Sequence, residues 1–271
     1  AALLGDTTDS RLTGTARVEG RSFDPETMRL DAELTLRDSF YGLHQLSSLS
    51  TTATLDRGQL ASETDATLND GTWTFALEGT PFAPRPTVEL TRGRFRNFDV
   101  GPFLGDTTQT TQLHGTMRGT VQGTDPDTMR ADGSLTLDSS RVNRERIDDA
   151  ALDLRLRDGQ LDADLTIDTP GGGADVAATA RPFDAVPTYR VAEGSFEEVD
   201  AGALAGQSGL STALSGSLSL TGRGATASAL ALDATLSFAD SRINDATLSQ
   251  GRLRATTDAG RSTLDGRFAM G

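Results

Sequence analysis

Few side chains in this sequence have the chemistry that catalysis requires. Its 271 residues include two histidines, His44 and His114, and no cysteine. The absence of cysteine excludes thiol nucleophiles, disulfide frameworks and thiolate zinc sites. A hydrolase needs a nucleophile, a base and an orienting group, and the sequence has no Gly-x-Ser-x-Gly elbow. His114 aligns with Thr13 and Ser215 of the repeat described below, which predicts a solvent-facing strand position. We therefore expect no enzyme activity.

Carboxylates are abundant, but their spacing does not predict a site. Doublets such as Asp148-Asp149 and Glu197-Glu198 point to opposite faces of a strand, so they do not converge on a glycosidic bond. A glycan-acting enzyme would also need stacking aromatics, and aromatics are 5% of the residues. The segments 125–133 and 171–175 lack the ligand spacing of calcium loops and are interpreted as turns. We predict neither a metal nor a cofactor.

The charge balance excludes one class of partner. Arginine supplies all 25 cationic residues against 39 carboxylates, which gives a net charge of −14. Nucleic acids and anionic membrane surfaces are bound by basic faces, so neither is expected as the main partner. Hydrophobic residues make up 36% of the chain, below the usual 45–50% or so of globular domains. This composition predicts a thin core.

The elements that carry these residues recur along the chain. Asp24–Arg29 (DPETMR) returns 101 positions later at 125–130 as DPDTMR, and Leu12-Thr13-Gly14-Thr15 has counterparts at 113–116 and 214–217. The repeat predicts three units, residues 1–105, 106–206 and a truncated 207–271, in one continuous elongated structure. An array cut within a unit suggests a longer parent protein. No apolar run here approaches the roughly 18 residues of a spanning helix, so any membrane anchor is expected outside these residues.

Within each unit the apolar residues alternate with polar ones. Leu30, Ala32, Leu34 and Leu36 alternate with polar residues, a period of two that is typical of half-buried strands. The pairs Asp70-Gly71, Asp132-Gly133 and Asp158-Gly159 are interpreted as turns, and short helices are considered at 40–48 and 99–104. The pattern predicts five or six strands per unit, in a sheet with one apolar face and one polar, solvent-exposed face.

The apolar positions are the candidate site. Alternation alone favours an ordinary β-sandwich core, which remains the alternative fold. Many of these positions hold Ala, Thr or Gly, however, and would pack such a core poorly. We therefore expect an all-β, repetitive, curved antiparallel sheet, rolled like a taco around a lightly filled apolar groove. The expected groove residues are Leu34, Leu36, Leu135, Leu137, Leu154, Leu156, Leu165, Ile167, Leu230, Leu232, Leu236 and Phe238.

Several of the recurring motifs have a family resemblance. They are Leu-x-Gly-Thr-x-x-x-x-Gly at 12–20, Leu-x-Leu-x-Ser-Ser at 135–140, Asp-Gly-x-Leu at 158–161 and Gly-x-Phe-x-x-x-Asp at 194–200. This set of motifs resembles the repeats of the AsmA-like proteins, in particular those of the TamB (translocation and assembly module) branch. The resemblance implies a periplasmic segment of an inner-membrane-anchored protein of the Gram-negative envelope. It also implies a phospholipid or other acyl-chain ligand, and an outer-membrane barrel partner for the full-length protein.

The main functional alternative is a structural, adhesin-like β-repeat module of the cell surface. A solenoid version of it should have a rung period of roughly 20 residues, whereas the observed period is 101. The sequence thus favours a non-enzymatic envelope protein that carries lipid or supports outer-membrane assembly.

Overall fold

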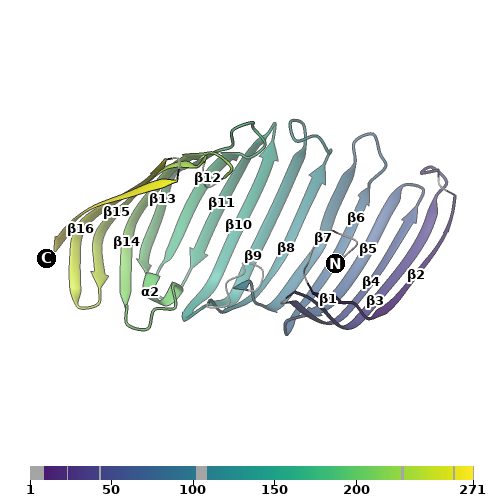
Figure 1. The fold of residues 1–271 in the computed structure, drawn as a ribbon, viewed down its shortest axis with the longest axis horizontal. Helices are drawn as coiled ribbons and strands as arrows, with labels where there is room; N and C mark the ends of the chain where they lie inside the picture. Colours follow the sequence, from purple (N-terminus) through teal and green to yellow (C-terminus); the bar gives the residue numbers. More distant parts are fainter. Residues whose placement is uncertain are drawn as a thin grey trace. The chain divides into compact units, whose positions relative to one another are not determined.

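The chain folds into β-strands that pair with their neighbours in sequence (Figure 1). The structure, a computed structural model, describes residues 9–22, 24–42, 44–101, 109–226, 229–258 and 260–270. It divides into two compact units, unit 1 (residues 1–124) and unit 2 (residues 125–271). The boundary between the units falls in the connection between two strands, not at a repeat boundary.

Unit 1 is an antiparallel meander. Its strands pair in chain order from β2 to β8, and β1 extends the first edge by pairing with β3. The strands are β1 (Ser10–Arg11), β2 (Gly14–Arg21), β3 (Arg29–Tyr41), β4 (His44–Asp56), β5 (Gln59–Leu68), β6 (Gly71–Thr80), β7 (Thr87–Phe98) and β8 (Thr111–Gln122).

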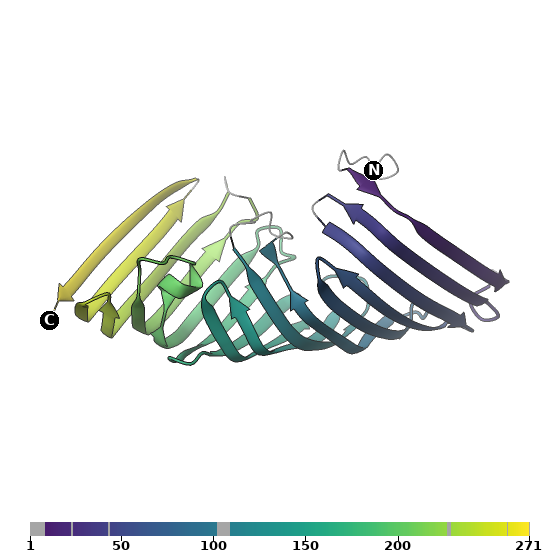
Figure 2. The same ribbon diagram turned by 90° about the horizontal axis from the view of Figure 1, so that it is seen from below.

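Unit 2 continues the same pattern in a second meander, whose strands lie side by side in a single layer (Figure 2). One short helix, α2, joins β13 to β14. The elements are β9 (Arg130–Val142), β10 (Glu145–Arg157), β11 (Gln160–Asp168), β12 (Gly173–Arg181), β13 (Thr188–Val199), α2 (Ala201–Leu204), β14 (Thr212–Arg223), β15 (Ala231–Ile243), β16 (Ala246–Asp258) and β17 (Arg261–Met270).

The all-β repetitive antiparallel fold is confirmed, with six strands per repeat. Strands β2–β7 recur as β8–β13, and β14–β17 begin a third set. The first and last strands of each unit do not pair with each other in the described residues, so the sheet of each unit is open. It is not strongly curled either, so the rolled, taco-like sheet expected from the sequence is not found in either unit. Neither unit forms the two packed sheets of the sandwich alternative within its described residues. No helix in the described ranges is long and apolar enough to cross a bilayer.

Most of the turn predictions are confirmed. Asn69 and Asp70 both have positive φ, as do Asp158 and Gly159. Two such residues in succession are typical of type I′ hairpin turns. The predicted turn at 171–175 is confirmed only in its first part: Gly172 and Thr169 exchange backbone hydrogen bonds of 3.2 and 2.7 Å, whereas β12 already begins at Gly173.

Two local predictions are wrong and one is only partly described. Residues 44–56 form strand β4, not a helix at 40–48, because their side chains alternate between the two faces of the sheet. Asp132-Gly133 lies inside β9, where Gly133 faces Leu154, because the chain already turns at Asp125, whose carbonyl accepts from the Thr128 N–H at 3.0 Å. Most of the predicted helix at 99–104 lies outside the described residues; its counterpart in the next repeat is α2.

One face of the sheet in each unit is apolar, and no second layer of described residues packs on it. Eight hydrophobic residues are buried in the described chain. The accessible surface is 16979 Å², against roughly 11,000 Å² for a compact protein of 28.5 kDa. Single-layer sheets account for this excess, because an apolar face without a second layer stays partly in contact with water.

The tightest packing lies at a serine that recurs in each repeat. Ser39, Ser140 and Ser241 are each 1% exposed, and each follows a residue with positive φ. The Oγ of Ser241 accepts from the N–H of Ser215 at 2.9 Å and lies 3.1 Å from the carbonyl oxygens of Ser215 and Ala239, to which it can donate. The recurring serine therefore supplies hydrogen bonds to the backbone where the positive φ of the preceding residue makes the strand irregular.

We expect Ser241→Ala to lower the free energy of unfolding by about 1–2 kcal/mol, because the N–H of Ser215 loses its partner in a buried place. Thermal denaturation followed by circular dichroism measures the loss, with the exposed Ser219→Ala on β14 as control. Equal unfolding midpoints for the two variants would contradict the role assigned to Ser241.

Candidate functional site

The candidate site is the apolar face of each unit, defined by cross-strand register. In unit 2 two adjacent rows run across all nine strands. One row is Leu135, Leu152, Leu165, Val176, Gly194, Leu218, Leu236, Leu253 and Gly266. The other, which we call the Phe/Gly row for its second half, is Leu137, Ala150, Ile167, Ala174, Phe196, Gly216, Phe238, Gly251 and Phe268.

The structure places most of the predicted groove residues on these faces. Leu34 and Leu36 lie together on β3 of unit 1 and face Ala16 and Gly14 of β2. Leu230 precedes β15 and is not part of a strand. The remaining residues lie on the apolar face of unit 2: Leu135, Leu137, Leu154, Leu156, Leu165, Ile167, Leu232, Leu236 and Phe238.

Several members of the rows were not predicted from the sequence. Leu152 and Leu253 follow the same alternation and could have been found by extending it. Val176 is harder to recognise, because its strand β12 consists largely of Ala and Thr. The membership of Gly194 and Gly216 could not be predicted, because a glycine has no side chain to reveal its face.

The apolar face is accessible as well as continuous. Leu154 in unit 2 and Leu34 and Val88 in unit 1 are each 37% exposed. Scattered exposed apolar side chains are ordinary, so this exposure points to binding only together with the continuous rows of unit 2.

Unit 1 contains a cluster of aromatic side chains that pack against one another. The Trp73 ring lies 4.3 Å from Phe98 and 5.6 Å from Phe95, measured between ring centroids. Phe95 faces Trp73 across strands β6 and β7 and is 3% exposed. Further from this cluster, the hydroxyls of Thr51 and Thr64 bond to each other at 3.0 Å on the same face. Unit 1 is therefore less uniformly apolar than unit 2.

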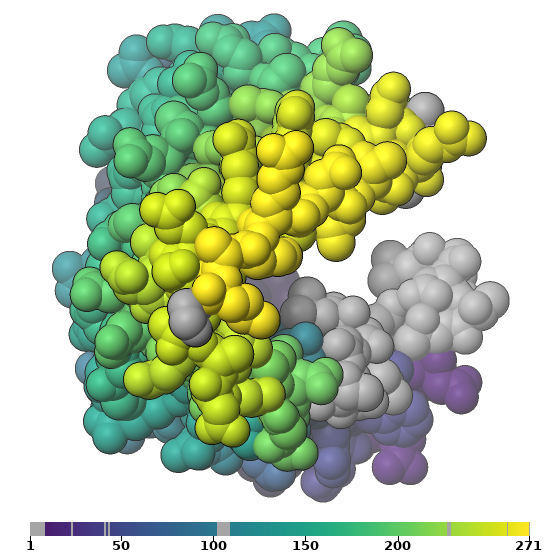
Figure 3. All heavy atoms as spheres, turned by 90° about the vertical axis from the view of Figure 1, so that its left-hand side faces the viewer, coloured from purple at the N-terminus to yellow at the C-terminus, as the bar shows by residue number. Residues whose placement is uncertain are grey.

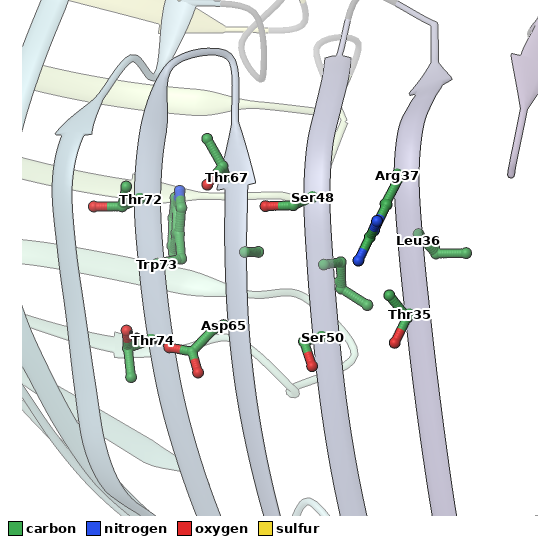
Figure 4. Close-up of a pocket in the computed structure, with 12 residues that line it drawn as sticks. Thr35, Leu36, Arg37, Ser48, Ser50, Asp65, Thr67, Thr72, Trp73 and Thr74 are labelled. Atoms are coloured by element: carbon green, nitrogen blue, oxygen red, sulfur yellow. Dashed lines mark hydrogen bonds between the residues drawn. The ribbon is translucent and has the colours of Figure 1, made fainter. Parts of the chain in front are cut away.

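Polar side chains line a hollow in unit 1 (Figure 4). Asp65 and Thr74 point toward each other there, and the threonine hydroxyl donates to the carboxylate at 2.8 Å. Arg37 lies on β3 at one side of the hollow. The described residues contain no cluster of His, Asp and Glu that could hold a metal ion, and no paired nucleophile and base lines this hollow.

Exposed ion pairs cover the opposite, polar face. Arg29 lies 2.9 Å from Asp56, and Arg92 lies 3.0 Å from Glu63. Such pairs stabilise a fold by about 0–1 kcal/mol, so their main effect is solubility. The hydrogen bond from Arg254 lowers the pKa of Asp233 on this face of unit 2.

A carboxylate pair lies beside α2. Asp200 caps the helix by accepting from the Ala203 N–H at 3.0 Å. Partial burial raises the pKa of Glu145 above its ordinary value of 4.5, the negative charge of Asp200 raises it further, and a hydrogen bond with Thr169 lowers it. Ionised Glu145 therefore destabilises this end of the sheet.

We expect Glu145→Gln to raise the unfolding midpoint at pH 7 by about a degree, a few tenths of a kcal/mol, since the group is only partly buried and solvent screens its charge. The raised pKa means that the folded chain takes up the proton first as the pH falls. The gain should therefore be complete above the folded pKa and vanish below pH 4.5. Thermal melts at pH 7 and below pH 4.5 test this, with the exposed Glu193→Gln as control. A gain that persists at the lower pH would contradict it.

Comparison with known proteins finds no matching family model, and neither a curated protein nor a solved structure has significant similarity to the chain.

Proposed function

We propose that the apolar faces of this chain bind the acyl chains of lipids and that the chain is a non-enzymatic, lipid-carrying β-scaffold. One observation carries the proposal: continuous rows of apolar residues and glycines run across the strands of unit 2, and Leu154, two residues along β10 from the row residue Leu152 on the same face, is 37% exposed.

The dimensions of these rows suit an acyl chain. Nine strands at about 4.8 Å spacing extend a row over about 38 Å. An acyl chain spans half of a hydrocarbon core about 30 Å thick, or about 15 Å, and would cross three to four strands. Each methylene withdrawn from water contributes about 0.8 kcal/mol, so contact along such a chain is strongly favourable.

The composition of the rows favours movement along them. In the row from Leu135 to Gly266, seven of the nine positions are Leu or Val and the other two are Gly, so successive binding places along this row would have similar free energies. A bound chain could then shift from strand to strand without a deep trap, while its polar headgroup stays in water. Because the sheet of each unit is open, the bound chain would lie on an uncovered apolar face and not inside a rolled groove.

The resemblance of the sequence motifs to AsmA-like proteins supports a cellular setting for this proposal. In that setting the chain would be a periplasmic segment of an inner-membrane-anchored protein. It would carry phospholipid toward the outer membrane or support assembly there with a barrel partner. The acidic, lysine-free polar face would keep such a segment soluble.

Native mass spectrometry of the purified 271-residue protein tests the proposal. After incubation with dispersed phosphatidylethanolamine, we expect lipid adducts on the folded protein, and competition by a free fatty acid. A protein that stays lipid-free under these conditions, together with an unchanged unfolding midpoint, would contradict lipid binding and leave a structural module as the better explanation.

A further inference from the structure

The polar face of unit 2 carries a patch in which arginine and threonine alternate. It lies at one end of β12, β13 and β14, which are neighbours in the sheet (Figure 1). In one row a threonine of β13 faces an arginine on each side, and in the next row an arginine of β13 faces a threonine on each side. The first row is Arg181, Thr188 and Arg223, the second is Thr179, Arg190 and Thr221, and we call these six residues the Arg/Thr patch.

Strand alternation places the Arg/Thr patch on the face opposite the apolar rows. Tyr189 and Val191 of β13 face alanines of β12 on the apolar side. Thr188 and Arg190 alternate with them and therefore point to the other side of the sheet. All six side chains of the patch are exposed, and atoms in the green of these strands lie at the surface in Figure 3. The patch is thus open to a ligand from water.

The three arginines of the patch have no anionic partner among the described residues. None of them takes part in an ion pair or donates a side-chain hydrogen bond there. Arg190 is the diagonal neighbour of both Arg181 and Arg223. Diagonal neighbours lie about 7–8 Å apart, within reach of long side chains, so three like charges can meet around one point.

The carboxylates around the patch do not neutralise it. Asp162 and Asp233 face its outer threonines from the flanking strands. Asp162 accepts from a glutamine of its own strand at 2.8 Å, and Asp233 accepts from Arg254 at 2.6 and 3.0 Å. Glu193, beyond a bulge of β13, and Asp184, in the β12–β13 connection, form no ion pair in the described part of the chain.

The first repeat shows that the sheet does not require these arginines. The six equivalent positions, 101 residues earlier, pair in the same register and hold no arginine. Arg190 corresponds to Glu89, so the same place in the repeat carries the opposite charge. The strands form with either charge, which points to a ligand of unit 2 as the reason for its arginines. The equivalent residues are Glu78, Thr80, Thr87, Glu89, Thr120 and Gln122.

A phosphate dianion matches the chemistry of the patch. Guanidinium groups bind phosphate oxygens through two parallel N–H donors, and threonine hydroxyls supply further donors. Phosphomonoesters, with a second pKa of about 6, are largely dianionic at neutral pH. The net charge of −14 repels extended polyanions and anionic membranes, so a single small ion fits the patch better than either.

We propose that the Arg/Thr patch binds a small, water-soluble phosphate dianion, either free phosphate or the terminal group of a phosphomonoester. The bound ion offsets the mutual repulsion of Arg181, Arg190 and Arg223 and thereby stabilises unit 2. The patch lies on the face opposite the apolar rows, so the proposal does not depend on lipid binding.

Isothermal titration calorimetry of the 271-residue protein with inorganic phosphate, at constant ionic strength in neutral buffer, tests the proposal. We expect one site per chain, weakened about tenfold or more by Arg190→Gln, which removes the central charge. Arg252→Gln on β16 removes the same charge from another exposed position of the polar face and should leave the affinity unchanged. Glycerol phosphate in place of inorganic phosphate distinguishes the two sources: tighter binding assigns the site to a phosphomonoester, weaker binding to the free ion.

Arg190→Glu separates loss of binding from loss of the fold. It installs the residue that the first repeat has at the equivalent position, so we expect an unchanged circular dichroism spectrum and no measurable phosphate binding. An unmodified chain that binds no phosphate, or equal weakening by Arg190→Gln and Arg252→Gln, would overturn the proposal. Binding to phosphatidylglycerol vesicles without binding of soluble phosphate would assign the patch to a membrane surface and would overturn it as well.

Discussion

Leu165→Gln is expected to reduce the lipid bound per protein molecule by about tenfold or more. Leu165 lies in the middle of its row, between Leu152 and Val176. An acyl chain lying on the row would cover the new amide and strip its water without offering a hydrogen bond. Such desolvation costs about 1–3 kcal/mol, and 1.4 kcal/mol is a factor of ten in affinity. Native mass spectrometry with the same phospholipid measures the change.

The adjacent residue supplies the matched control. Thr166 is exposed on the opposite face of β11, where its hydroxyl donates to Asp175 at 2.9 Å. Thr166→Gln makes a similar change to the strand but leaves the apolar face intact, so bound lipid should stay at the original level. Leu236→Gln on β15 should repeat the loss, because Leu236 lies in the same row. Equal lipid binding by Leu165→Gln and Thr166→Gln would rule out the apolar face as the binding surface.

Phe95→Ala is expected to destabilise unit 1 by about 3–5 kcal/mol. Phe95 is 3% exposed and packs against Trp73 and Phe98, so truncating it leaves a cavity in the best-packed part of the unit. Trp73 is the single tryptophan of the chain, which makes its fluorescence a local probe. Its denaturation curve should shift to lower denaturant concentration.

Hydrogen–deuterium exchange locates the loss of stability. Faster exchange is expected in β6, β7 and β8, while β14 to β17 should keep their protection, since they belong to unit 2 and the cluster belongs to unit 1. Phe183→Ala, at a phenylalanine that is 47% exposed, is the control and should change little. A shift of the Trp73 curve equal to that of the control would contradict the assigned packing.

The sequence by itself predicted an all-β repeat of five or six strands, against six in the structure, and which side chains share a face. A period of two is a local property: successive side chains leave a strand on opposite sides whatever its partners are. Leu135 and Leu137 could therefore be assigned to one face, and the 101-residue shift carried the assignment to Leu34 and Leu36. The paired positive φ angles at Asp158 and Gly159 are likewise properties of a short segment.

Only the tertiary structure decided which residues lie opposite each other. Register depends on pairing between strands, on bulges and on where each turn begins, and no short segment contains that information. Asp132-Gly133 has the composition of a turn, yet it lies inside β9, because the chain had already reversed at Asp125. The position of Gly216 opposite Phe196 became visible through register alone. A glycine carries no side chain to show its face, so its role comes from the neighbouring strand.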